Sequence, residues 1–166
     1  MHTLKQSQFL PITLEEAWDF IQAPANLDTI TPPWLRFAIL SEVPDIMENG
    51  LIIEYRIGLP VIGRQRWVTE IKHITPLCSF VDEQRLGPYR FWYHHHALKE
   101  VDGGVLMTDT VRYRLPFGPL GELVHALVIR KVLRQIFQYR HHRFTELFGP
   151  QEPTITKKAE TDTLEN

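Results

Sequence analysis

The sequence predicts an α+β protein in which a curved antiparallel sheet of about seven strands wraps around one long C-terminal helix. Three observations predict it: apolar residues alternate with period two from residue 35 to 115, hairpin turns occur at Gly87-Pro88 and Asp102-Gly103-Gly104, and residues 122–148 contain neither proline nor glycine. An antiparallel sheet with one apolar face must bury that face, and the long helix is the only element large enough to cover it. A curved sheet around one helix can leave a cavity between the two.

The N-terminal part predicts a strand and a short helix. Residues 3–12 carry spaced apolar side chains, and Pro11 indicates a strand end. Thr13 and Glu16 have the spacing of a capping box, so a short helix should follow and stop before Pro24. The prolines within Thr31–Trp34 exclude a regular helix there and predict a turned segment.

The middle of the chain predicts six strands. Trp67 shares one strand face with Thr69, and Asp109 shares another with Tyr113. The turn at residues 102–104 predicts a hairpin between the last two strands. The expected strands span residues 35–43, 51–57, 64–74, 79–86, 89–101 and 105–115.

The last predicted element is a helix over residues 119–148. Its apolar stripe changes phase: Leu123 and Leu127 share one face, whereas Leu133 and Phe137 share another. Either the two halves cover different surfaces or the helix bends near Arg130. We expect a core helix whose early face lines the cavity, with a membrane face or a homodimer interface as alternatives.

Composition indicates one soluble domain over residues 1–150. Of 166 residues, 43% are apolar and 23% charged, and the net charge is −2, so no general electrostatic attraction favours nucleic acid or an anionic membrane. Cys78 is the one cysteine, which excludes an internal disulfide. No signal peptide and no membrane-spanning run is evident, which predicts a cytoplasmic protein. Residues 151–166 are polar without aromatics, so we expect a disordered tail.

Three consecutive histidines are the most prominent chemical feature. On a strand, His94 and His96 point to one side and His95 to the other. Two histidines can begin a zinc or iron site, and Asp109 on the next strand could be a third ligand if the register allows it. No H-E-x-x-H or C-x-x-C motif is present, and we predict neither a metal nor a cofactor. Asp109 is expected to act as a buried polar clamp rather than as a general acid or base.

Aromatic residues are numerous enough to line a cavity for an apolar ligand, although ordinary core packing explains any single one of them. The residues expected to contact such a ligand are Trp67, Trp92, His94, His96, Asp109, Tyr113, Leu123 and Leu127.

Several segments also resemble a known superfamily. QSQFLPITLEEAWDFIQAPANLDTITPPW, FWYHHHAL, TDTVRYRLPFGPLG and IFQYRHHR occur in this order. They resemble the START and Bet v 1-like (SRPBCC, helix-grip) superfamily, and within it a bacterial subgroup with W-x-H-x-H and T-D-x-V-x-Y-x-L-P-x-G motifs. The resemblance covers residues 3 to about 148. It implies a helix-grip fold, and it is a poor guide to activity because this fold serves lipid carriers, polyketide cyclases and plant ligand binders.

Together these observations predict a protein that binds a small hydrophobic molecule, such as a lipid, quinone or polyketide, without chemistry. One alternative is a cyclase- or aromatase-like enzyme that uses Asp109 with His94 or His96 in the same cavity. Another is a protein-interaction module that uses the first half of the long helix and the Thr31–Trp34 loop.

Overall fold

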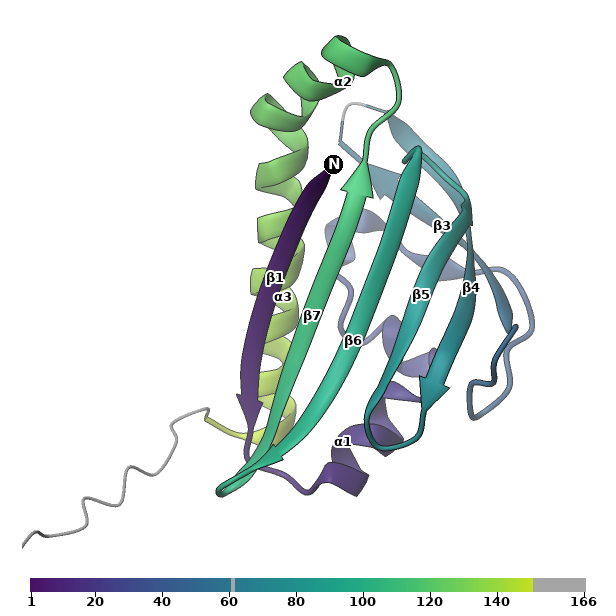
Figure 1. Cartoon of the computed structure of the whole chain (residues 1–166). Coiled ribbons are helices and arrows are strands. Elements are labelled where there is room, and N and C mark those ends of the chain that lie inside the picture. Colours follow the sequence, from purple (N-terminus) through teal and green to yellow (C-terminus); the bar gives the residue numbers. More distant parts are fainter. Residues whose placement is uncertain (61, 151–166) are drawn as a thin grey trace, which may run out of the picture.

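The computed structural model describes residues 1–60 and 62–150, so the expected tail over residues 151–166 lies outside the described part. Its centre is one antiparallel sheet of seven strands in the order β1-β7-β6-β5-β4-β3-β2 (Figure 1). The predicted architecture is confirmed. The strands are β1 (His2–Leu10), β2 (Ala38–Ile39), β3 (Ile52–Leu59), β4 (Gly63–Thr75), β5 (Ser79–Leu86), β6 (Phe91–Val101) and β7 (Gly104–Arg114).

The long C-terminal helix lies along the inner face of this curved sheet, and α1 lies at the opposite end from α2 (Figure 1). Within the described residues no helix is both long enough and apolar enough to cross a membrane. The α-helices are α1 (Leu14–Ile21), α2 (Gly118–Val124) and α3 (Arg130–Phe148); η1 (Pro24–Leu27) and η2 (Pro33–Leu35) are 3₁₀ turns, and η3 (His125–Ile129) is a π-helix.

The predicted capping box begins α1. The backbone N–H of Glu16 donates to the Thr13 hydroxyl at 3.2 Å, and the Thr13 N–H donates to the Glu16 carboxylate at 2.9 Å. Two of the otherwise unpaired donors at this helix start are thereby satisfied. Ala17 and Trp18 can then face the core, where both are buried.

The strand expected over residues 35–43 is wrong in extent, because only Ala38–Ile39 pairs with β3. Pro33 starts a 3₁₀ turn that ends at Arg36 in a left-handed conformation, which delays the strand. Beyond β2, the N–H groups of Leu40 and Ser41 both point to the carbonyl of Glu54, at 2.8 and 3.3 Å. Two residues facing one partner disrupt a regular ladder, so the edge strand stops there.

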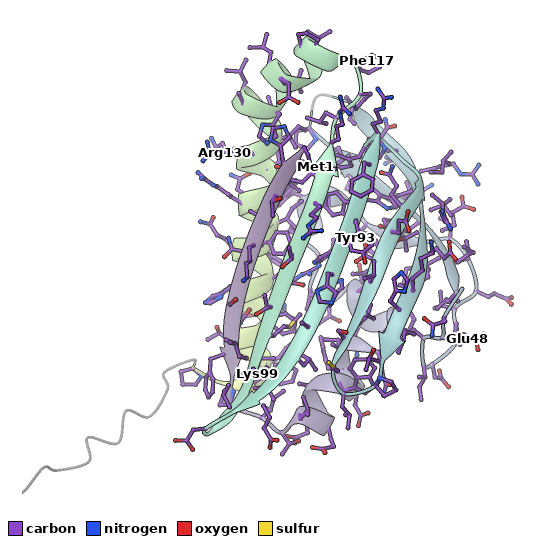
Figure 2. The ribbon with its side chains drawn as sticks, in the orientation of Figure 1. Met1, Glu48, Tyr93, Lys99, Phe117 and Arg130 are labelled. Atoms are coloured by element: carbon purple, nitrogen blue, oxygen red, sulfur yellow. The ribbon has the colours of Figure 1, made fainter. Side chains whose placement is uncertain are left out.

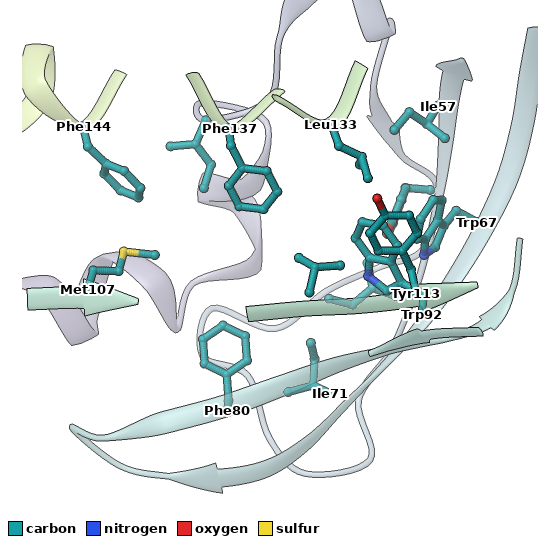
Figure 3. Close-up of a cluster of buried hydrophobic side chains, with 14 of the residues drawn as sticks. Ile57, Trp67, Ile71, Phe80, Trp92, Met107, Tyr113, Leu133, Phe137 and Phe144 are labelled. Atoms are coloured by element: carbon teal, nitrogen blue, oxygen red, sulfur yellow. The ribbon is translucent and has the colours of Figure 1, made fainter. Parts of the chain in front are cut away.

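The core fills the space between helix and sheet. Leu133, Phe137 and Phe144 point from α3 toward the sheet, while Trp67 and Trp92 rise from the strands (Figure 3). Trp67 packs edge-on against Trp92 with ring centroids 5.1 Å apart. Together with Tyr89 and Tyr113, these two rings form a group at the α2 end of the core, which we call the aromatic wall.

Strict alternation on β6 and β7 decides which side chains face the helix. Trp92, His94, His96 and Leu98 are buried, whereas Tyr93 projects from the outer face of the sheet (Figure 2). His96 lies directly opposite Asp109 in the β6–β7 register. Both the metal-site hypothesis and the polar-clamp hypothesis for Asp109 require the two residues to be close. This part of the sheet positions the polar side chains described below.

The phase change of the long helix coincides with the π-helix η3. A π-turn holds more residues per turn than an α-turn, so it rotates the faces of α2 relative to those of α3. Val132, Leu133 and Phe137 face the core, but Leu123 and Leu127 are 55% and 69% exposed. Their expected position in the cavity wall is therefore corrected: the buried residues of this segment are Gly121 and Ile129, and Val124 packs against the core.

Candidate functional site

Five polar side chains meet in the middle of the core. Asp82 comes from β5, His94 and His96 from β6, Asp109 from β7 and Arg140 from α3; we call them the polar cluster. His94, His96, Asp109 and Arg140 are each no more than 9% exposed. Because a charge is rarely buried without partners, their mutual contacts determine what the site can do.

The two imidazoles lie between the two carboxylates. His94 Nε2 is hydrogen-bonded to Asp109 Oδ1 at 2.9 Å, and His96 Nε2 to Asp82 Oδ2 at 2.7 Å. The other two nitrogens are also close to carboxylate oxygens: His94 Nδ1 lies 3.0 Å from Asp82, and His96 Nδ1 lies 2.8 Å from Asp109. Trp92 Nε1 donates a further hydrogen bond to Asp82 at 3.2 Å.

These contacts fix the charge of several members. Burial by itself lowers the pKa of His94, but the carboxylates of Asp82 and Asp109 outweigh it and raise this pKa to about 9. Burial favours a neutral Asp109, yet its hydrogen bonds with His94 and His96 hold its pKa well below the ordinary value. The same balance lowers the pKa of Asp82. At neutral pH His94 is therefore a cation and both aspartates are anions.

A saturated ion cluster is poorly suited to proton transfer near neutral pH. A general base acts best when its pKa lies near the working pH. The protonated His94 cannot accept a proton, and the strongly acidic Asp109 is a weak base. The shifted pKa values of His94 and Asp109 thus favour the clamp interpretation of Asp109 over the general acid-base one.

Arg140 is less well paired than the rest of the cluster. Its Nη1 lies 3.7 Å from Asp109 Oδ1, beyond hydrogen-bond distance, and its guanidinium sits 5.2 Å from the centre of the Phe137 ring. Within the described residues, Arg140 Nε and Nη1 have no hydrogen-bond partner, nor does the buried Trp67 Nε1. Buried donors are normally satisfied, so these three are exceptions.

Two small cavities flank the polar cluster. One, of about 90 Å³, lies toward α1 and is lined by Phe80 and His96, among others. The other, of about 100 Å³, lies toward the aromatic wall and is lined by Trp67, Trp92 and His94. Both have Leu27, Tyr55, Asp82 and Arg140 in their walls.

A larger cavity of about 570 Å³ opens at the end of the sheet beneath α2; we call it the outer cavity. Leu59 and Tyr89 belong to both its wall and the wall of the 100 Å³ cavity. The remaining wall is apolar except for Gln65, and includes Leu120 and Val124 of α2. The three spaces thus follow one another along the helix, separated by shared side chains.

The residues predicted from the sequence fall into three groups. Trp67, Trp92, His94 and His96 line the two interior cavities. Asp109 is in the polar cluster, and the Tyr113 hydroxyl is hydrogen-bonded to His125 Nε2 at 2.8 Å. Leu123 and Leu127 lie outside all of these cavities.

Sequence reasoning missed Asp82 as a member of the site. A signal existed, since Asp82 alternates with the buried Phe80 and lies opposite His94 in the β5–β6 register. Arg140 was also not among the residues expected to contact a ligand. Tyr55 and Leu27 were not predicted to line a cavity either, because residues between two cavities have no characteristic spacing in the sequence.

Among residues 1–60 and 62–150, two groups of side chains bring metal-ligand atoms within 4.8 Å of one another: Asp82, His94 and His96 in the cluster, and His2, Glu122 and His125 near α2. In the first group nitrogen and oxygen atoms are 2.7–3.0 Å apart, as in hydrogen bonds. Ligands of a tetrahedral zinc ion at about 2.0–2.1 Å would be spread farther apart. In the second group the rings of His2 and His125 stack with centroids 3.6 Å apart.

No protein-family profile and no curated protein matches the chain. Solved structures do. Protein CV1439 from Chromobacterium violaceum matches with a TM-score of 0.68 and 11% identity, over 91% of this chain and 100% of the other. A START superfamily protein from Mycobacterium smegmatis matches with a TM-score of 0.60 and 12% identity, over 89% and 99%.

A third match is a part of a larger protein. The nucleoside-diphosphate sugar epimerase from Corynebacterium glutamicum is 25% identical, with a TM-score of 0.62, over 86% of this chain but 28% of its own. The seven-stranded antiparallel sheet and the long helix across it agree with these matches. The chain therefore has the helix-grip fold of these structures, one of which is a START superfamily protein.

Proposed function

We propose that the protein binds a small hydrophobic molecule in the space between the sheet and the C-terminal helix. The observation that carries this proposal is the outer cavity, whose volume of about 570 Å³ falls within the range of about 300–1,000 Å³ usual for ligand pockets. Its walls are almost entirely apolar, so burial of an apolar ligand is favourable there. The START-like fold supports the same function.

The outer cavity exists because α2 is held close to the end of β7 at one point and stands away from the sheet beyond it. Gly121 is that point, since a Cβ atom there would lie only 2.1 Å from the carbonyl oxygen of Pro116. After Gly121, Leu123 of α2 and Leu127 of the π-helix η3 are both exposed. Large apolar side chains that could have filled the space point to solvent instead.

An acid-base enzyme of the cyclase or aromatase kind is the weaker candidate. Such an enzyme needs a group that gains and loses a proton near neutral pH. In the polar cluster, ion pairs keep His94 protonated and Asp109 deprotonated at that pH. The raised pKa of His94 and the lowered pKa of Asp109 both work against that role.

A matched pair of tryptophan variants tests the binding function. Val124 lines the outer cavity, whereas Leu127, three residues later, is 69% exposed. We expect an environment-sensitive apolar dye to bind the native protein saturably at about one to one, and Val124→Trp to weaken this binding at least about tenfold by filling the cavity. Leu127→Trp adds the same indole outside and should leave the affinity unchanged.

Fluorescence titration measures both affinities, and thermal melting confirms that both variants are folded. A linear, non-saturating dye signal with native protein contradicts the proposed function. Equal affinities for both tryptophan variants would place the ligand elsewhere than beneath α2.

A second candidate function is supported by the exposed apolar side chains of the same segment. Leu120, Leu123 and Leu127 are 62%, 55% and 69% exposed, and Phe117 at the start of α2 is 79% exposed. A cluster of this kind on a soluble domain often marks a protein interface. We propose self-association through this face as the second candidate; its test is given in the Discussion.

A further inference from the structure

Arg140 is a buried cation, and two of its nitrogen atoms have no hydrogen-bond partner among the described residues. It is 9% exposed and belongs to the walls of both interior cavities. An arginine carries five N–H donors that cannot be removed by deprotonation. In the described residues its Nε and Nη1 donate to nothing, and the nearest carboxylate oxygen is 3.7 Å from Nη1.

Asp109 does not satisfy Arg140, because the oxygen that lies nearest to Nη1 is 3.7 Å away and already has two imidazole partners. Its Oδ1 receives the hydrogen bond of His94 Nε2 at 2.9 Å and is also 2.8 Å from His96 Nδ1. Asp82 is similarly engaged by both imidazoles and by Trp92 Nε1. The carboxylates of the cluster therefore leave Nε and Nη1 of Arg140 without a hydrogen bond among the described residues.

A second unpaired donor belongs to a residue in the wall of the same cavity. Trp67 Nε1 is buried without a hydrogen-bond partner among the described residues, and both Trp67 and Arg140 line the 100 Å³ cavity. This cavity adjoins the outer cavity at Leu59 and Tyr89. A ligand entering beneath α2 would therefore meet apolar walls first and unpaired donors at the inner end.

We propose that the natural ligand is an apolar carboxylic acid, whose carboxylate is held by Arg140 in the 100 Å³ cavity and whose apolar body extends past Leu59 and Tyr89 into the outer cavity. The inference rests on the proposed function and names the class of its ligand. A planar carboxylate matches the fork of a guanidinium and can accept two parallel hydrogen bonds. A neutral alcohol of the same length offers one hydroxyl in place of two carboxylate oxygens, so it cannot accept from Nε and Nη1 in this bidentate way.

The test compares decanoic acid with 1-decanol by displacement of the apolar dye at pH 7.5. With native protein we expect the acid to bind about 10- to 100-fold more tightly, the range for a hydrogen bond to a charged group. Arg140→Met retains an unbranched side chain of similar length but removes the charge, so it should abolish this preference while decanol binding persists. Decanol binding also shows that the variant is folded.

Two further variants keep the test decisive. Arg134→Met removes a charge from an exposed position of α3, and it should leave the acid preference intact. Trp67→Phe retains an aromatic ring without its donor, and should weaken acid binding by a few fold even if Arg140→Met does not fold.

The outcomes separate the two proposals. Equal binding of acid and alcohol to native protein, or an acid preference that survives Arg140→Met, overturns the carboxylate inference and leaves the hydrophobic-ligand function standing. If the dye and both decane derivatives fail to bind, the proposed function itself falls.

Discussion

At the residue scale, the polar cluster ties three neighbouring strands to one another and brings Arg140 of α3 against them. Its members were only partly predictable. Alternation placed His94 and His96 on one face, and the β6–β7 hairpin placed Asp109 beside them. Asp82 was missed because a single aspartate in a strand reads as a solvent-facing residue unless its cross-strand partner is known. The network as a whole also depends on the register between β5 and β6, which places Asp82 opposite His94 and which the predicted turn between these strands did not specify.

The pH dependence of stability tests the charge on His94. Its pKa is raised from an ordinary value of 6.5 to about 9 in the folded protein, so protonated His94 stabilises the fold fully below pH 6.5 and loses this effect as pH rises through 9. The loss corresponds to about 3 kcal/mol in the free energy of unfolding. Urea denaturation at pH 6, 7.5 and 9 measures it.

His94→Gln should remove most of this decline, whereas His142→Gln should not, because the His142 side chain is 70% exposed. A native protein whose stability is flat from pH 6 to 9 would show that His94 is not charged in the fold.

At the element scale, the C-terminal helix shows which features the apolar pattern predicts and which it does not. Its position, length and phase change were evident in the sequence, and a bend was one of the two alternatives considered. A π-helix at His125–Ile129 was not foreseeable, because an added residue per turn and a bend both shift an apolar stripe. The orientation of Leu123 and Leu127 followed from that local choice, and so did the outer cavity.

Gly121→Ala tests how α2 is held. The added Cβ would meet the backbone carbonyl of Pro116 at 2.1 Å, and backbone cannot yield as a side chain can. We expect α2 to shift, dye affinity to fall several-fold, and the free energy of unfolding to drop by about 1–3 kcal/mol. Lys131→Ala, at an exposed position of α3, is the control and should change neither quantity. Native affinity in Gly121→Ala would mean that α2 does not shape the pocket.

At the scale of the whole molecule, the sequence was most informative. Hairpin turns and alternation predicted an antiparallel sheet, and the helix that must cover it followed from burial alone. What the pattern left open is how closely the two pack. The interior cavities reflect particular side chains such as Tyr55 and Leu27, whose fit depends on the finished fold.

Self-association through the exposed α2–η3 face is expected to appear as a concentration-dependent dimer in sedimentation velocity experiments. Leu123→Glu and Leu127→Glu place charges in that face and should shift the equilibrium toward monomer. Leu86→Glu, at a side chain that is 56% exposed on β5, should not. A protein that sediments as a monomer at about 100 μM, with or without these changes, contradicts an interface here.

The pairing of β1 with β7 has a consequence for synthesis on the ribosome. Ser7 and Thr108, which are hydrogen-bonded across the two strands, are 101 residues apart in the chain. At about 5–20 residues per second, β1 waits roughly 5–20 s for its partner to be translated. An unpaired strand is a template for association with other nascent chains. The polar run Lys5-Gln6-Ser7-Gln8 in its centre makes β1 a poor template during that interval.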